Sequence, residues 1–190
     1  MKIVILAGGY GTRLSEYTDL IPKPMVTIGG KPILLRIMSI YAHYGYKDFY
    51  LALGYKSEVI CKFFNCQLND STSYRIGDKI VNIRLFDTGK DTMTGGRLKR
   101  LEKVIGNETF MLTYGDGLAD INLESLEKFH KFQKSLVTVT AVRPPARFGA
   151  LKIEGSKVIN FEEKNPLSEG WINGGFFVME PDFLKSIHDD

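Results

Sequence analysis

The feature that most constrains the fold is a short apolar run at the amino terminus that ends in a glycine-rich loop. After Lys2, the residues Ile3 to Leu6 are all β-branched or leucine, with no polar residue between them. The glycine-rich segment Gly8-Gly9-Tyr10-Gly11 follows after one alanine. Such a run is typical of a strand buried on both faces, as in a parallel sheet. The sequence therefore indicates an α/β protein with helices on both faces of a sheet.

Helix and strand patterns alternate along the rest of the chain. A helix is expected after Pro32, from Ile33 to about Gly45, and a helix at 123–132 is expected to be capped by Asn122 or Asp120. Further helices are expected at 58–64, at 97–105 and, as a short one, at 181–188. Further strands are expected at 49–53, 81–86, 109–113, 137–142 and 175–179.

Two other segments complete the expected organisation. Residues 150–153 and 158–161 flank Glu154-Gly155-Ser156-Lys157, which predicts a β-hairpin. Residues 65–80 are polar and irregular, and we interpret them as a surface insertion. The prediction is a three-layer sandwich with a mostly parallel, mixed, Rossmann-like sheet and one small hairpin. Ligands then bind beyond the carboxyl ends of the strands.

Composition narrows the possible functions. The chain has 190 residues, 44% of them hydrophobic, which predicts a single domain over residues 1–190. The net charge of +3 is mild and the basic residues are spread out, so we expect no nucleic-acid groove. The amino-terminal apolar run is too short for a signal or a membrane span, so we expect a cytoplasmic protein. Cys61 and Cys66 lack a metal-ligand spacing and are interpreted as packing groups.

The first glycine loop is suited to phosphate. Its small residues let main-chain N–H groups approach an anion, and Arg13 adds a planar, permanently charged fork. Leu14 stands where a dinucleotide fingerprint needs its third glycine, and no P-loop Gly-Lys-Ser or Gly-Lys-Thr follows. A polyphosphate site and an ordinary turn both remain compatible with this loop.

Two charged residues stand in rigid or open surroundings. Lys23 lies between Pro22 and Pro24, which stiffen the backbone and limit where the ammonium can go. Asp116 lies between two glycines after an expected strand, where a carboxylate could hold Mg²⁺ together with phosphates and water. Ordinary turns would also accommodate both residues.

In combination, these motifs resemble a known family. Leu6-Ala7-Gly8-Gly9-x-Gly11-Thr12-Arg13-Leu14, followed by Lys23-Pro24-Met25 and then Gly30-Lys31-Pro32-Ile33, is similar to the sugar-phosphate nucleotidyltransferases. The stretch from Asp87 to Arg100, which contains Thr92-Met93-Thr94-Gly95-Gly96-Arg97, most resembles the glucose-1-phosphate cytidylyltransferase branch. The resemblance runs from Met1 to about Met179, with a gap in the middle.

The resemblance implies roles for particular residues. Arg13 and Lys23 would be catalytic, and Asp116 would bind Mg²⁺ as the cofactor. Nucleotide-binding residues would be Leu6, Ala7, Gly8, Gly9, Gly11, Thr12, Thr92, Gly96, Arg97 and Gly115, with Thr92 and Arg97 at the cytosine or its ribose. Acceptor-binding residues would be Lys164, Asn173 and Gly174, beside the predicted hairpin. From the residues alone, Thr94-Gly95-Gly96 is either an anion or base platform or a plain helix cap.

Departures from the family pattern lie mainly on the acceptor side. Glu163-Lys164-Asn165-Pro166 is one residue longer than the family motif, and the chain stops at Asp190, before the family's second metal-binding Asp. The segment between Tyr55 and Asp87 is short, which leaves a homo-oligomer possible but its contacts undefined. Arg143 and Arg147 also recur in the family without an assigned role. We therefore expect conserved chemistry with an altered acceptor.

The expected function is transfer of CMP from CTP to a small phosphorylated acceptor, with release of pyrophosphate. The leading acceptor is a sugar 1-phosphate such as glucose 1-phosphate, for surface polysaccharide or capsule. The alternative acceptor is a non-sugar phosphate or phosphoramidate such as phosphoglutamine. An alternative of another class is a catalytically silent, nucleotide-binding regulatory domain.

Overall fold

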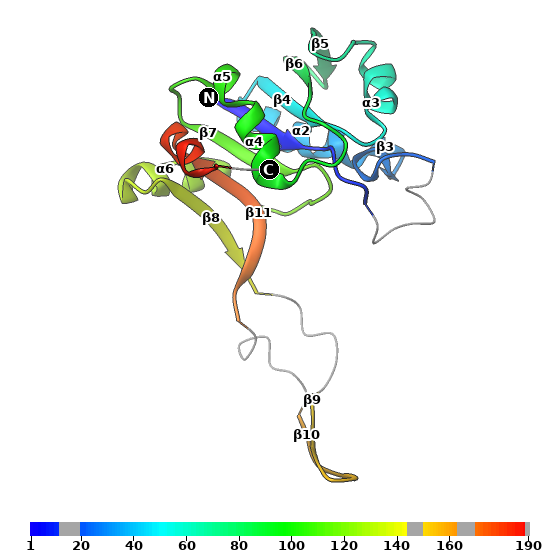
Figure 1. Cartoon of the computed structure of the whole chain (residues 1–190), viewed down its shortest axis with the longest axis vertical. Helices are drawn as coiled ribbons and strands as arrows, with labels where there is room; N and C mark the ends of the chain where they lie inside the picture. Colours follow the sequence, from blue (N-terminus) through cyan, green and yellow to red (C-terminus); the bar gives the residue numbers. More distant parts are fainter. Residues whose placement is uncertain (12–19, 144–149, 163–169, 189–190) are drawn as a thin grey trace.

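The computed structural model describes residues 1–11, 20–143, 150–162 and 170–188 (Figure 1). Its centre is a seven-stranded sheet in the order β5-β6-β4-β1-β7-β11-β8. The central strand β1 (Lys2–Leu6) pairs in parallel with β4 (Asp48–Leu53) on one side and with β7 (Phe110–Tyr114) on the other. The first apolar run is therefore fully flanked by strands, as its sequence predicted.

The outer strands make the sheet mixed. β6 (Lys79–Asp87) continues the parallel series next to β4, and β5 (Ser71–Ile76) is antiparallel to β6. On the other side, β11 (Ile172–Met179) lies antiparallel between β7 and β8 (Val137–Val142). This confirms the predicted mostly parallel, mixed sheet.

The prediction of a surface insertion at 65–80 was wrong, because these residues contain strand β5. Its residues alternate between exposed and half-buried side chains, and Tyr74 and Ile76 pack against the core. Serines, a threonine and an arginine fill most other positions, so the period-two pattern carries little apolar signal. Pairing with β6 supplies the stability that the sequence itself does not indicate.

Helices cover both faces of the sheet. Ile3 and Ile5 of β1 pack in one core with α2 (Ile33–His43), α3 (Ser57–Phe64) and the start of α6 (Leu123–Gln133). Val4 points to the opposite face, where it packs in a core with α4 (Thr94–Arg100), α5 (Glu102–Ile105) and the 3₁₀ helix η3 (Pro181–Ser186). Successive strand residues thus supply two cores, and the three-layer prediction is confirmed.

Helix boundaries differ from the sequence prediction in two places. The helix expected at 97–105 is two short helices that meet at Leu101, and Gly106 ends the second with a φ of 69°. The short helix expected at 181–188 is the 3₁₀ helix η3. At α6 the cap is Asn122, whose side chain accepts a hydrogen bond of 2.9 Å from the Ser125 N–H.

Two small hairpins lie outside the main sheet. β9 (Ala150–Glu154) and β10 (Lys157–Glu162) form the predicted antiparallel hairpin, which Figure 1 shows apart from the sheet. A second pair, β2 (Thr27–Ile28) and β3 (Lys31–Pro32), follows the 3₁₀ turn η2 (Lys23–Met25) and precedes α2. This second pair fixes the chain between η2 and α2.

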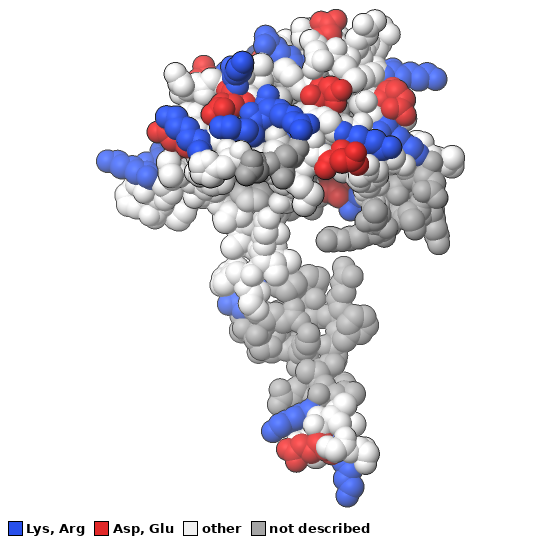
Figure 2. All heavy atoms as spheres, viewed as in Figure 1, with Lys and Arg blue, Asp and Glu red and all other residues white. Residues whose placement is uncertain are grey.

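Charge is mixed over the surface seen in Figure 2, where basic and acidic side chains are interspersed. No helix in the described ranges is long and apolar enough to cross a membrane.

Candidate active site

A pocket of about 370 Å³ lies where the loops after β1, β6 and β7 meet, beyond the carboxyl ends of these parallel strands. This is the edge of an α/β sheet at which ligands bind. Most of the site residues predicted from the sequence line this pocket: Leu6, Ala7, Gly8, Gly9, Gly11, Lys23, Thr92, Arg97 and Asp116. The chain folds so that residues more than a hundred positions apart share one cavity.

Two predicted nucleotide residues stand behind the pocket wall. The Gly115 N–H donates a hydrogen bond of 2.8 Å to the Leu6 carbonyl oxygen, and a Cβ on Gly115 would lie 2.9 Å from the same oxygen. Gly115 therefore lets the end of β7 pack closely on the end of β1. Gly96 is buried within α4, which begins at Thr94. The N-cap residue of this helix is Met93, whose side chain makes no capping hydrogen bond.

The acceptor residues that the structure describes lie beside the pocket. Asn173 donates from Nδ2 to the Tyr114 hydroxyl over 3.3 Å, and Tyr114 lines the pocket. A Cβ on Gly174 would lie 2.9 Å from the Thr140 carbonyl oxygen, so this glycine allows β11 to approach β8. The Arg143 guanidinium lies over the Trp171 ring, 4.5 Å from its centroid. Thr12, Arg13, Arg147 and Lys164 lie outside the described residues.

One end of the pocket carries an ion pair. The Lys23 ammonium lies 2.5 Å from Oδ2 of Asp116, and both side chains are partly exposed. Lys23 opens the 3₁₀ turn η2, which the Met25 N–H closes on the Pro22 carbonyl oxygen over 2.8 Å. A partly exposed ion pair contributes little stability. The pair is therefore better explained by the two charges that it places at the pocket than by a contribution to the stability of the fold.

Another wall of the pocket is built around Arg97, which is 4% exposed. Its guanidinium donates hydrogen bonds of 2.7 to 3.2 Å to the carbonyl oxygens of Gly8, Leu53, Gly89 and Lys90 and to Oγ1 of Thr88. These acceptors belong to the end of β4 and to the loops after β1 and β6. A Cβ on Gly8 or Gly54 would overlap the guanidinium, so the loops close around this one side chain.

Arg100 reinforces the same wall. Its Nη1 donates to the Thr88 carbonyl oxygen and to Oγ1 of Thr92, and Thr92 is almost fully buried. Thr92 and Arg97 thus face the pocket while they hold its loops together. Their predicted contact with a nucleoside stays a prediction.

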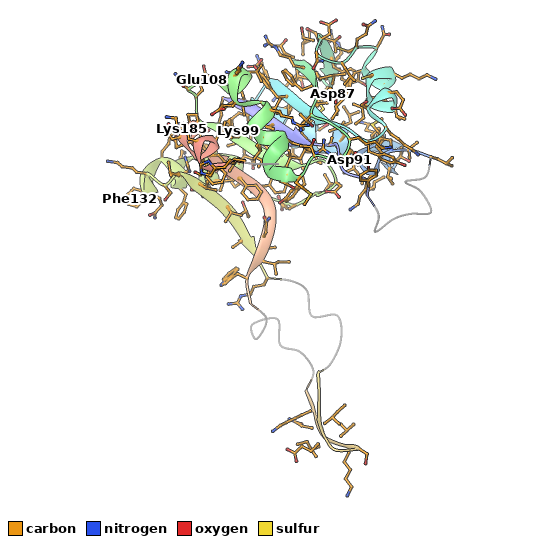
Figure 3. All side chains as sticks on the ribbon, in the orientation of Figure 1. Asp87, Asp91, Lys99, Glu108, Phe132 and Lys185 are labelled. Atoms are coloured by element: carbon orange, nitrogen blue, oxygen red, sulfur yellow. The ribbon has the colours of Figure 1, made fainter. Side chains whose placement is uncertain are left out.

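The mouth of the pocket contains a cluster that the sequence did not predict. The Tyr10 hydroxyl donates a hydrogen bond to Oδ1 of Asp91, and the Tyr10 and Tyr55 rings lie 4.9 Å apart. The Lys90 ammonium lies 5.8 Å from the Tyr10 centroid and 5.9 Å from the Tyr55 centroid. Figure 3 labels Asp91 on the loop between β6 and α4. The hydrogen bond to Asp91 raises the pKa of Tyr10, which keeps its hydroxyl a donor.

A glycine loop, a lysine–carboxylate pair and a third loop tied by arginine, all at the carboxyl ends of parallel strands, define a nucleotide-binding α/β enzyme. A family comparison makes this more specific. The nucleotidyl transferase family model matches residues 2–190, and the chain belongs to that family. It is a nucleotidyltransferase.

Individual relatives agree with this assignment. The chain is 46% identical to the glucose-1-phosphate cytidylyltransferase of Salmonella typhi, over all of this chain and 79% of that protein. It is 34% identical to the D-glycero-alpha-D-manno-heptose 1-phosphate guanylyltransferase of Campylobacter jejuni, over 97% of this chain and 78% of that protein. The crystal structure of HddC from Yersinia pseudotuberculosis superposes with a TM-score of 0.70 at 27% identity, covering 97% and 78% of the two chains.

Proposed function

We propose that this nucleotidyltransferase is a cytidylyltransferase, which transfers CMP from CTP to the phosphate of a sugar 1-phosphate such as glucose 1-phosphate and releases pyrophosphate. The observation that carries the proposal is the Lys23–Asp116 pair, which faces the same pocket as the glycine loop. The choice of CTP and glucose 1-phosphate is supported by the 46% identity to the Salmonella typhi enzyme.

In this proposal, an oxygen of the acceptor phosphate attacks the α-phosphorus of CTP in line, and pyrophosphate leaves. The attacking oxygen is already ionised at neutral pH, so the protein needs no general base. Its contribution is position and charge compensation. Lys23 would lie against the reacting phosphates, and the flanking prolines hold its backbone in place before the substrates arrive.

Asp116 has the properties expected of a Mg²⁺ ligand. It is a partly exposed carboxylate that lines the pocket, and Mg²⁺ in proteins uses one or two carboxylates and takes its other ligands from phosphates and water. Oδ2 pairs with Lys23, and Asp116 has a second oxygen for a metal ion. When bound, Mg²⁺ would draw negative charge from the phosphate oxygens. Asp116 itself would hold the Lys23 ammonium and the ion on one side of the pocket.

The remaining predicted residues keep their proposed roles. The main chain of Gly8 to Gly11 would hold the nucleotide, Arg13 the leaving pyrophosphate, and Asn173 and Lys164 the acceptor. Arg97 and Arg100 would keep the nucleoside side of the pocket in shape through the loops that they join. A single domain, a homo-oligomer and a cytoplasmic location stay predictions.

Pyrophosphate release from CTP tests this function directly. Purified protein with Mg²⁺ is incubated with CTP and with glucose 1-phosphate, other sugar 1-phosphates or phosphoglutamine, one at a time. We expect turnover with a sugar 1-phosphate that falls about a hundredfold in Lys23→Ala. Turnover with phosphoglutamine alone would show that the acceptor is this phosphoramidate and not a sugar 1-phosphate. CTP binding without turnover on any acceptor would favour the silent regulatory domain.

A further inference from the structure

The pocket has two carboxylates among its described lining residues, and they differ in their surroundings. Asp116 is compensated by the Lys23 ammonium at 2.5 Å, whereas Asp91 accepts a hydrogen bond from the neutral Tyr10 hydroxyl. The Lys90 ammonium also lies on this side, over the Tyr10 ring, so charge alone does not place the triphosphate. The proposed function places the reacting phosphates and the metal ion at the Lys23–Asp116 pair, and we therefore expect the nucleobase at Asp91.

Many of the main-chain carbonyl oxygens on the loops around Asp91 already accept hydrogen bonds. Arg97 donates to the carbonyl oxygens of Gly8, Gly89 and Lys90, and Arg100 donates to the carbonyl oxygen of Thr88. Oγ1 of Thr92 accepts from Arg100 as well. Asp91 is different, because an ionised carboxylate has about four lone-pair sites and Tyr10 uses only one of them. It can still accept a hydrogen bond from a ligand.

Tyr10 gives this carboxylate a fixed position. Its ring packs against Tyr55 at 4.9 Å, and its hydroxyl reaches Asp91 from the loop after β1, on the other side of the pocket mouth. The residue pair is 81 positions apart in the chain, so the contact joins two separate loops. An exposed aspartate with such a support presents its acceptor atoms in a defined direction.

Resting on the proposed function, we propose that Asp91 selects cytosine over uracil by accepting a hydrogen bond from the exocyclic amino group at C4, with Tyr10 as the residue that positions Asp91. Cytosine presents an N–H donor at this point, and uracil presents a carbonyl acceptor. A carboxylate has only acceptors at neutral pH, so it attracts the first and repels the second. Hydrogen bonds to charged groups are worth roughly a tenfold to a hundredfold preference, and the exposure of Asp91 favours the lower end.

The decisive variant is Asp91→Asn, because an amide can rotate to offer either a donor or an acceptor. With glucose 1-phosphate as acceptor, kcat/KM is measured for CTP and for UTP. We expect the CTP-to-UTP ratio to fall about tenfold or more in Asp91→Asn, mainly through a gain with UTP. Tyr10→Phe keeps the carboxylate without its support, and its ratio should fall less.

Asp87→Asn is the matched control. Asp87 lies at the start of the same loop, but its carboxylate accepts from the Gly89 N–H and is not among the pocket-lining residues. A disturbed loop should change the rates with CTP and UTP by the same factor, so the ratio stays at the wild-type value. A ratio that is unchanged in Asp91→Asn, or that falls equally in Asp87→Asn, overturns the proposal.

A binding measurement separates this inference from the catalytic proposal. The triphosphate of pyrimidin-2-one riboside lacks the amino group of CTP, and its affinity is compared with that of CTP by calorimetry. Wild type should bind CTP about tenfold more tightly, whereas Asp91→Ala should bind both alike. Full discrimination in a folded Asp91→Ala protein overturns the role of Asp91. An absence of turnover in wild type that still prefers CTP would instead refute the proposed reaction.

Discussion

Lys23 and Arg97 are two cations that line one pocket, and they are held in opposite ways. Lys23 stands on a short turn, partly exposed, with its ammonium on a carboxylate. Arg97 is buried, with its planar guanidinium among main-chain carbonyl oxygens. A partly exposed point charge on a fixed backbone can meet a phosphate, whereas a buried fork fixes the groups around it. The comparison separates charge that acts on a substrate from charge that builds the site.

Asp116→Asn should have the largest effect on turnover. Loss of the carboxylate removes the expected metal ligand and the partner of Lys23, and we expect pyrophosphate release to fall about a thousandfold. The melting temperature should hardly change, because a partly exposed pair contributes little to folding. Asp182→Asn, at the exposed Lys185 pair on η3, is the control and should stay active. An active Asp116→Asn protein would contradict the assigned role.

Lys23→Ala should come next. If the ammonium meets charge that develops during transfer, kcat falls about a hundredfold, again with a nearly unchanged melting temperature. Steady-state kinetics with CTP would reveal the split between kcat and KM. A raised KM at constant kcat would assign Lys23 to ground-state binding alone.

Arg97→Met should change stability as well as activity. The substitution leaves several buried carbonyl oxygens without their donors, and we expect a loss of about 3 kcal/mol in the free energy of unfolding. For a chain of this size, the melting temperature would fall by about 6–12 °C. Differential scanning calorimetry and kcat/KM are measured on the same sample. A full loss of kcat/KM at an unchanged melting temperature would mean that Arg97 acts on the nucleotide rather than on the loops.

Asn122→Ala should have the smallest effect and calibrates the others. It removes the cap of α6, Asn122 is not among the pocket-lining residues, and the change should cost about 1 kcal/mol. Because no pocket residue depends on this cap, kcat and KM for CTP should stay at wild-type values. If activity also falls, a modest loss of stability is enough to impair the site. A loss of activity in Arg97→Met would then follow from its lower stability and would say nothing specific about the pocket loops.

The sequence predicted the fold most accurately where local pattern and tertiary environment agree. The buried strands β1, β4 and β7 are continuous apolar runs, so their burial is visible in composition alone. β5 was missed because an edge strand needs few apolar residues when its neighbour already covers one side. The break at Leu101 between α4 and α5 carries no proline or glycine within it, and the pattern predicted one helix instead.

For the site, short motifs predicted more than long-range geometry. Gly8, Lys23 and Asp116 each have glycines or prolines as sequence neighbours, which mark these segments as unusual turns. All three residues line one pocket. The Tyr10–Asp91 contact had no such signal, because neither residue is unusual in its own segment. Arg97 was predicted as a pocket residue, but its burial among carbonyl oxygens depends on three loops that meet only in the folded chain.

The position of β11 has a consequence for how the chain is made. β8 is synthesised before β11 but joins the sheet only through it, since β11 lies between β7 and β8. As the chain leaves the ribosome, β7 therefore exposes an unpaired edge, and Phe176 and Val178 are still missing from the core beneath it. The order of synthesis and the order of sheet closure differ here, which makes the interval before β11 emerges the stage at which a nascent chain most needs protection from aggregation.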